Sequence, residues 1–433
     1  MPRFSGLLVL AAVLVLAALL VGAAPGPSAG AQTAPSTSVG FSGAAADQQL
    51  EALAVQIGSR PAGSAAYDRA VDYAADQLRQ WGYQPTLQTF PVQVFDDRGS
   101  HVWVRTDSGD AVEVAADTLT YSAAGDLDAP LVAAGLGRPA DVADVDVRGK
   151  IALIKRGELR FSDKVANAAA AGAVGVIVYN DSAGRVQGSL VGPGAIAAAT
   201  ISADSGQQLL GMLAAGALTA HLTVDASTEQ RTGTNVVADL AGRRPDAGTV
   251  VFGAHLDSGP AGPGANDNGS GSAVVLELAH SLAAAASPPA VNVRLALWGA
   301  EELGLYGSHY FVQNLSDAER RAILANINLD MVGVGQSWRF GGSDELVQLA
   351  LGAANDLGQR ALPLRDGSLS GGSDHASFLE AGIPAVFINR VEDPNYHTAG
   401  DLASLVDPDA LTQAGTIALR VLDAVATDGA PGG

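Results

Sequence analysis

The sequence predicts an α/β protein: a three-layer α/β/α sandwich with a mostly parallel central sheet, interrupted by an inserted, mainly-β segment. Short runs rich in Val, Ile and Phe alternate with longer segments of helical periodicity, and this alternation is typical of parallel α/β sheets. Several of these runs end directly in acids or histidines. The length of 433 residues exceeds the size at which single cores usually stop growing, so we expect two domains or one large insertion.

The overall composition excludes two classes of function. The formal net charge is -20 and no run of Lys or Arg occurs, whereas nucleic-acid binding requires clustered positive charge. The chain contains no cysteine, which removes thiol catalysis and thiolate zinc sites. Any transition-metal site must therefore use His, Asp and Glu.

The N-terminus has the order of a secretory signal. Arg3 precedes an apolar stretch over residues 7–24, and a small-residue site, Ala29-Gly-Ala31, follows it. We therefore predict a signal peptide at 1–31 and a secreted, extracellular protein without a stable membrane partner. The alternative is a retained membrane anchor, because 18 apolar residues can span a bilayer.

Residues 32–111 are expected to begin the main domain after a small, polar leader. Helical spacing covers 48–57 and 65–81, where Tyr67, Val71 and Leu78 share one face. The link between these helices, 58–64, is a loop by its Gly and Pro content, and strand-like alternation begins near Thr86.

Residues 112–230 differ in character and are predicted to form the insertion. A strand at 149–157, a helix at 161–171 and a strand at 173–180 follow one another. This segment resembles the protease-associated (PA) domain through Gly149, Arg156, Phe161, Lys164 and the Ala-Gly-Ala step before the strand. Two roles stay open for it: covering a crevice and so contacting substrate, or binding another protein.

Residues 231–426 are predicted to complete the main domain, before a tail at 427–433. Strands at 234–240 and 249–254, joined by a turn-rich linker, are expected to be neighbours. Further strands and helices then alternate along the chain: strands at 291–298, 322–329 and 385–389, and helices at 270–286, 344–357 and 408–426.

Polar residues follow the carboxyl ends of the predicted strands. His255 and Asp257 end the first of these, Glu301-Glu302 and Asp330 follow the next two, and Tyr396-His397 follows the last. Ligands of parallel sheets bind at this edge, so we expect these side chains to meet.

Four of these side chains, together with Asp267, make a set of five metal ligands. Imidazole and carboxylate suit zinc and related divalent ions, and five ligands for two metals require one bridging carboxylate. Each residue alone could be a helix cap or a surface polar group, but burial of all of them carries a desolvation cost that metal binding offsets. The set comprises His255, Asp267, Glu302, Asp330 and His397.

At these residues the chain resembles the zinc-dependent aminopeptidases of the M28 peptidase family. The shared motifs read Gly253-Ala-His-Leu-Asp-Ser258, Gly264-Ala-Asn-Asp-Asn-Gly-Ser-Gly271, Ala300-Glu-Glu-Leu-Gly304, Asn328-Leu-Asp-Met331 and Tyr396-His-Thr398. The resemblance implies a zinc-exopeptidase fold and hydrolysis of N-terminal residues, with large apolar ones such as Leu preferred. It implies two Zn²⁺ per chain, which activate water, and peptide or small protein substrates with a free N-terminus.

The resemblance also implies a role for each site residue. Asp267 would bridge the metals, His255 and Asp330 would bind one zinc, and Glu302 and His397 the other. Asp257 would orient His255, Glu301 would be the general base, and Tyr396 would donate to the developing oxyanion. Met331 and Phe387 would line the substrate pocket or simply pack in the core.

Three points stay open from the sequence. Some relatives carry Arg where this chain has Gly372, which affects how substrate is anchored. A co-catalytic zinc carboxypeptidase or amidohydrolase is the alternative enzyme. A catalytically inactive receptor or binding module is the alternative outside enzymes, although all five ligands and Glu301 are present.

Overall fold

The computed structural model describes residues 40–106, 108–109, 111–364 and 372–428. The expected signal peptide at 1–31 and tail residues 429–433 lie outside these ranges. In the part that is described, no helix has the length and apolarity needed to cross a bilayer.

The main domain is built on a mostly parallel sheet, as predicted. Its four central strands are parallel, and nearly every residue in them is buried. Their order across the sheet is β10 (Asn292–Trp298), β9 (Thr249–His255), β11 (Ile323–Leu329) and β14 (Ala385–Val391). Antiparallel strands flank them: β8 (Leu218–Leu240) beside β10 and β12 (Ser337–Gly342) beside β14. A short outer strand, β13 (Ala361–Pro363), pairs with β12.

One expected strand pairing is wrong. Residues 234–240 and 249–254 are not neighbours, because β10 lies between β8 and β9. The chain leaves β9 through a crossover helix, α6 (Gly271–Ala283), and returns as a parallel strand on the inner side of β8. A short linker predicts adjacent strands only for a hairpin, and parallel crossovers reorder the sheet.

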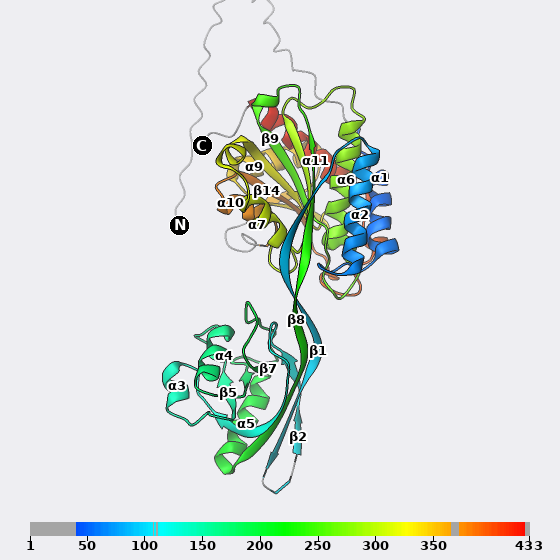
Figure 1. Cartoon of the computed structure of the whole chain (residues 1–433). Helices are drawn as coiled ribbons and strands as arrows, with labels where there is room; N and C mark the ends of the chain where they lie inside the picture. The colour runs from blue at the N-terminus through cyan, green and yellow to red at the C-terminus, as the bar shows by residue number, and fades with distance from the viewer. Residues whose placement is uncertain (1–39, 107, 110, 365–371, 429–433) are drawn as a thin grey trace, which may run out of the picture. The chain divides into compact units, whose positions relative to one another are not determined.

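Helices cover both faces of the sheet, because successive strand residues point to opposite sides. In β9, Val250, Phe252 and Ala254 enter one apolar core, and Val251 enters another. The larger core lies under α6 and four further helices: α1 (Gly43–Leu50), α2 (Ala65–Gln80), α9 (Asp344–Asp356) and α11 (Pro408–Asp428) (Figure 1). The smaller core packs against two helices on the other face, α7 (Tyr306–Gln313) and α10 (His375–Glu380).

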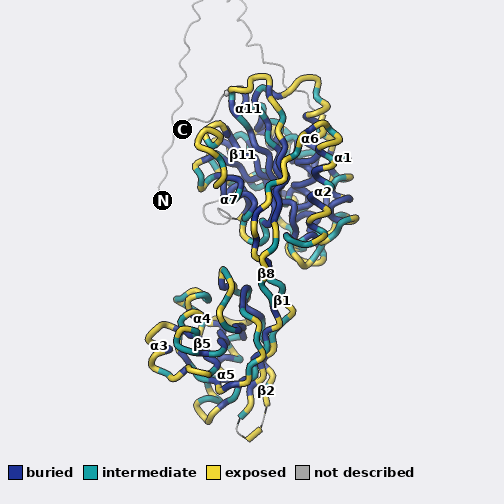
Figure 2. The backbone as a smooth tube through the Cα atoms, in the orientation of Figure 1, coloured by how far each residue is buried: buried dark blue, intermediate teal, exposed yellow. Residues whose placement is uncertain are grey.

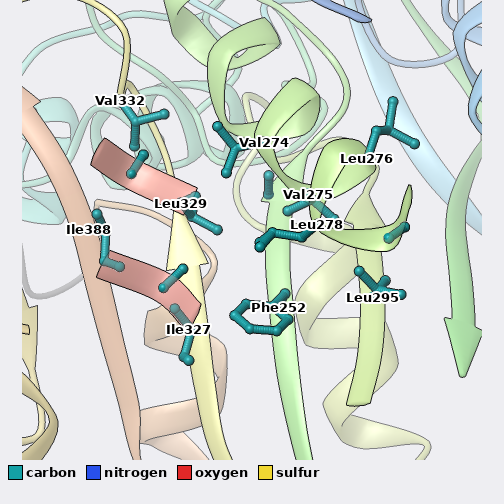
Figure 3. Packing of buried hydrophobic residues seen from close by; sticks show 14 of the residues in the cluster. Phe252, Val274, Val275, Leu276, Leu278, Leu295, Ile327, Leu329, Val332 and Ile388 are labelled. Atoms are coloured by element: carbon teal, nitrogen blue, oxygen red, sulfur yellow. The ribbon is translucent and has the colours of Figure 1, made fainter. Parts of the chain in front are cut away.

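Packing in the larger core fixes the crossover helix α6 against the sheet. Figure 3 shows Phe252 of β9 beside Val275 and Leu278 of α6, with Leu295 and Ile327 from the flanking strands. Burying one such side chain stabilises the fold by roughly 1.5–3 kcal/mol. This packing fixes the carboxyl ends of β9, β10 and β11 relative to one another.

The predicted helices form with local signals at their ends. Ser64 caps α2 by accepting a hydrogen bond from the amide of Tyr67 at 3.1 Å. The expected helix at 48–57 is found as α1 continued by a π-helical segment, η1 (Glu51–Ile57). Shorter elements complete the main domain: η2 (Pro245–Ala247), η3 (Ala265–Ser270), α8 (Asp317–Ala322) and η4 (Ala403–Leu405).

The insertion is reached through two long antiparallel strands. β1 (Thr86–Thr106) pairs with β8 from Thr86 opposite Val237 to Thr106 opposite Leu218, with one irregularity between Asp97 and Ser100. The rest of the insertion comprises β2 (Ala111–Val114), β3 (Ala116–Thr118), β4 (Gly125–Ala133), α3 (Pro139–Ala143), β5 (Ile151–Lys155), α4 (Phe161–Ala170), β6 (Gly175–Tyr179), β7 (Ala197–Ile201) and α5 (Ala203–Ala215). It has its own buried strands, shown dark in Figure 2, and therefore its own cores.

Candidate metal centre

The acids and histidines expected to converge do meet at the carboxyl edge of the sheet. His255 is the last residue of β9, and Asp330 follows β11 directly. Glu302 follows β10 after a turn at Gly299-Ala300, and Asp267 lies in η3, ahead of α6. His397 lies in the loop after β14. Neighbouring parallel strands thus place ligand atoms from five separate segments in one site.

Asp267 lies at the centre of this site. One carboxylate oxygen, Oδ1, is 3.2 Å from Nε2 of His255, and the other, Oδ2, is 3.1 Å from Nε2 of His397. Asp330 Oδ1 lies 3.4 Å from the same nitrogen of His255, and Glu302 Oε2 lies 3.1 Å from that of His397. The five residues therefore form two ligand groups that share Asp267: His255, Asp267 and Asp330 in one, and Asp267, Glu302 and His397 in the other.

The donor atoms of both groups fit a bound cation. Nε2 of His255, Oδ1 of Asp330 and Oε1 of Glu302 are buried and have no hydrogen-bond partner among the described residues. Buried polar atoms without partners are costly, and a metal ion would satisfy them. Imidazole nitrogens with carboxylate oxygens are the donor set that zinc accepts.

The protonation of the shared carboxyl and its histidines reflects their proximity. Burial alone would raise the pKa of Asp267, but the neighbouring imidazoles of His255 and His397 lower that pKa below its usual range. Hydrogen bonds to Asp267 and Glu302 raise the pKa of His397 to about 10. Burial opposes protonation of His255, but the charges of Glu301 and Asp330 raise its pKa above the usual range. Without metal, these carboxylates therefore favour the protonated imidazoles, and a divalent cation would compete with the added proton.

Asp257 supports the site through two contacts. Its backbone carbonyl accepts from Nδ1 of His255 at 3.1 Å, whereas its carboxylate lies 3.7 Å from that nitrogen. The carboxylate instead accepts the backbone N–H groups of Glu301 at 3.1 Å and Glu302 at 3.3 Å. Asp257 therefore fixes both His255 and the Glu301-Glu302 step.

The side chain of Glu301 borders the buried ligand group without belonging to it. Its Oε2 lies 3.9 Å from Nε2 of His255, and the side chain is 11% exposed. Burial raises the pKa of Glu301 well above its usual range; the charge of His255 opposes this and that of Asp374 adds to it. A carboxyl with a raised pKa holds a proton more readily than an exposed glutamate does, as is typical of groups that transfer protons in active sites.

Asp401, which the sequence analysis did not single out, orients the shared ligand. Its carboxylate accepts the backbone N–H of Asn266 at 2.7 Å and that of Asp267 at 3.0 Å. The neighbouring side chain of Asn268 bonds the carbonyl of Leu329 at 3.0 Å. The Asp267 segment is thus tied to the loop after β14 and to the last residue of β11. In the sequence, the only signal for this role of Asp401 is its position four residues after His397.

An open cavity of about 460 Å³ adjoins the ligands. Met331, Phe387, Gly372 and Tyr396 are among its lining residues. Tyr396 is half exposed, and its ring stacks on that of His397 with centroids 3.8 Å apart. The cavity can therefore receive an apolar group beside the metal ligands.

The Ser373–His375 segment lies buried behind the cavity. His375 stacks flat on Phe387 at 4.8 Å, and burial lowers the pKa of this histidine to about 4. Burial raises the pKa of Asp374 to about 7. These side chains therefore back the cavity wall and are not among the ligand groups.

Comparison with known proteins identifies the family. The model of peptidase family M28 matches residues 235–422, and the PA domain model matches 127–209. A probable leucine aminopeptidase 2 of Aspergillus fumigatus is 35% identical over 360 residues, which cover 78% of this chain and 70% of that protein. The chain belongs to peptidase family M28. The expected metallo-aminopeptidase with a PA domain is thereby confirmed.

Two solved aminopeptidase structures share the fold. The aminopeptidase from Aneurinibacillus sp. strain AM-1 aligns with a TM-score of 0.78 at 32% identity, covering 90% of this chain and 95% of that one. A zinc aminopeptidase from Bacillus subtilis aligns with a TM-score of 0.67 at 32% identity, and the alignment covers 88% of this chain and 95% of that one. The predicted α/β sandwich is confirmed, and the protein from Bacillus subtilis is named a zinc aminopeptidase.

Proposed function

We propose that this M28 enzyme is an exported aminopeptidase that uses two zinc ions and a glutamate base to remove N-terminal residues from peptides. The observation that carries the proposal is the position of Asp267, whose two oxygens each face a different histidine at 3.1–3.2 Å. A single-metal site would leave one of these histidines without a role. The sharing of one carboxylate between two ligand groups supports a dinuclear centre.

The five ligands divide between the two ions according to their contacts. His255 and Asp330 would hold one zinc, Glu302 and His397 the other, and Asp267 would bridge them. When bound, the two ions would polarise the scissile carbonyl and lower the pKa of a water molecule. Asp257 and Asp401 would keep the ligand-bearing segments in place through their backbone hydrogen bonds.

Glu301 is assigned as the general base. Its carboxyl group lies beside the buried ligand group without joining it, and its backbone is fixed by Asp257. It would take the proton of the attacking water and return it to the leaving amine. Tyr396, at the rim of the cavity, would donate its hydroxyl to the oxyanion.

The substrate would enter the cavity by its N-terminus. The carboxylates of Glu301 and Asp330 line the cavity and can accept hydrogen bonds from a free ammonium group. Met331 and Phe387 form an apolar wall for a large first side chain such as Leu. The related protein named as a leucine aminopeptidase supports this preference.

The rest of the chain is assigned from sequence and topology. We place a signal peptide at 1–31, the peptidase domain at 32–111 and 231–426, the PA insertion at 112–230 and a tail at 427–433. The order of charged, apolar and small residues at the N-terminus supports export. The PA insertion would contact either the substrate or another protein, and the negative net charge argues against nucleic acid.

The decisive variant is Glu301→Gln, which keeps the shape of the side chain and removes its basicity. Hydrolysis of leucine p-nitroanilide should fall by about 10²–10⁴-fold, while metal analysis should still find two zinc ions per chain. Leu303→Ala, two residues further along the chain and outside the ligand groups, serves as a control. Wild-type rates in Glu301→Gln would reject the assignment of the base.

A second experiment tests the requirement for a free N-terminus. The N-acetylated form of a good peptide substrate should not be cleaved, because an amide cannot provide the ammonium group that the acids accept. Robust cleavage of the acetylated peptide would favour the carboxypeptidase or amidohydrolase alternative. Binding of two zinc ions without hydrolysis of any peptide would favour a binding module.

A further inference from the structure

Arg60 is a wholly buried arginine in the loop between η1 and α2, and all its contacts converge on one segment. Its guanidinium donates to the carbonyls of Leu256 at 2.7 Å, Pro263 at 2.5 Å and Gly264 at 3.0 Å. Its backbone N–H donates to Oγ of Ser258 at 3.0 Å. The N–H of Ser258 also donates to the carbonyl of Arg60 at 3.4 Å, so five hydrogen bonds join Arg60 to residues 256–264, about 200 positions away in the sequence.

The segment held by Arg60 connects two metal ligands. It begins one residue after His255 and ends three residues before Asp267. Just beyond this segment, the carboxylate of Asp401 accepts the N–H groups of Asn266 and Asp267. The carbonyl of Gly264 also accepts the N–H of Gly269 at 3.0 Å, but those of Leu256 and Pro263 have Arg60 as their donor. Loss of Arg60 would therefore free the first part of the segment and leave the distance between His255 and Asp267 less well fixed.

A conventional ion pair does not explain this burial. Within the described ranges, the guanidinium contacts only carbonyl oxygens, and no carboxylate is paired with it directly. Burial lowers the pKa of Arg60 to about 10, with the charges of Asp257 and Asp401 opposing that shift, so it stays positively charged at neutral pH. A buried cation with this geometry is retained for its planar set of donors, which lysine cannot reproduce.

We infer that Arg60 is a positioning residue for the metal centre, which holds the loop 256–264 so that His255 and Asp267 meet the same ion. This inference rests on the metal site proposed above. It assigns no contact with substrate to Arg60. Residues that orient metal ligands from outside typically change metal affinity by about 10–100-fold when they are substituted.

Two substitutions distinguish the positioning role of Arg60 from an effect of its positive charge. Arg60→Lys keeps the positive charge and loses the planar donors, whereas Arg60→Gln keeps a planar donor group and loses the charge. If position matters, Arg60→Lys should bind zinc about tenfold more weakly or worse, and Arg60→Gln should not bind it more tightly. If Arg60 acted only through its charge, Arg60→Lys would match the wild type and Arg60→Gln would bind zinc more tightly.

The measurement is zinc affinity by competition with a chromogenic chelator, with the absorption spectrum of the cobalt-substituted protein as a second readout. Arg294→Lys is the matched control, because Arg294 makes a two-point contact with Asp239 on the sheet and touches no ligand segment. It should leave zinc affinity unchanged. Arg60→Lys should also alter the cobalt spectrum, which reports ligand geometry rather than fold stability.

The outcomes distinguish this inference from the proposed function. A wild-type protein that binds no zinc would refute the metal site itself. A wild-type protein that binds zinc, together with Arg60→Lys of equal affinity and unchanged spectrum, would refute only the role of Arg60. Should Arg60→Lys fail to fold, Ser258→Ala loosens the same attachment: weaker zinc binding would support the inference, and unchanged binding would overturn it.

Discussion

The two ligand groups that share Asp267 differ in how they are embedded. In the first, His255 is 1% exposed and Asp330 is 8% exposed, and both lie at the ends of central strands. In the second, the side chain of His397 is 48% exposed and lies in a loop, in a left-handed conformation with φ of +55°. One group is thus part of the sheet, and the other is completed by a loop.

This difference teaches how the centre should respond to change. Strand-end ligands are held by the packing of the core, whereas a loop ligand is held by few contacts and opens more readily. We therefore expect the buried group to bind zinc more tightly than the group containing His397. Asp267, which belongs to both, should be the residue whose loss has the largest effect.

Substitution of Asp267 by Ala should abolish both sites. Removing the shared carboxylate leaves two ligands for each ion, so zinc content should fall from two per chain to less than one. Activity should fall by roughly a thousandfold or more, because metal ions supply several kcal/mol of transition-state stabilisation. Metal analysis measures the zinc content, and peptide hydrolysis measures the activity. Asp128→Ala, at an exposed position, is the control. Two zinc ions retained in Asp267→Ala would contradict the bridging role.

Loss of the loop histidine should have a smaller effect than loss of the strand histidine. His397→Ala should retain about one zinc per chain, because the group of His255, Asp267 and Asp330 stays intact. His255→Ala should retain less, since its removal also leaves buried acids without their partner. Equal zinc content in the two variants would remove the distinction between the groups.

The smallest expected effect is on the stability of the metal-free protein as a function of pH. The pKa of His397 is raised to about 10, above its unfolded value of about 6.5. Its contribution to stability is therefore fully present below pH 6.5 and is lost as pH rises toward 10. Because His397 is half exposed, the effect is reduced by solvent, and His397→Gln should flatten the melting-temperature profile of the metal-free protein. An unchanged profile would show that protonation of His397 does not contribute to the pH dependence of stability.

The sequence predicted the parts of the site that lie next to strongly patterned elements. His255, Glu302 and Asp330 follow apolar runs whose length and composition indicate buried strands, so their convergence follows from the geometry of parallel sheets. The helix at 65–81 was also predictable, because its apolar spacing and Ser64 cap are local features.

The missed features depend on contacts between distant segments. Asp401 and Arg60 act on backbone groups of the 256–267 segment, and backbone groups carry no sequence signal. The order of β8, β10 and β9 likewise depends on where the parallel crossover returns to the sheet, not on the length of the linker between β8 and β9. The carboxylate of Asp257 bonds the amides of Glu301 and Glu302, which only the folded turn after β10 brings within reach.

The pairing of β1 with β8 has a practical consequence for the whole polypeptide. Val94 lies opposite Glu229. The residues before Val94 pair in register with those after Glu229, as far as Thr86 opposite Val237. A short turn joining these two positions would convert the ribbon into a simple hairpin and delete every residue between them. The chain thus carries a site at which the insertion could be removed by shortening β1 and β8, while the other helices and strands of the ligand-bearing half stay whole.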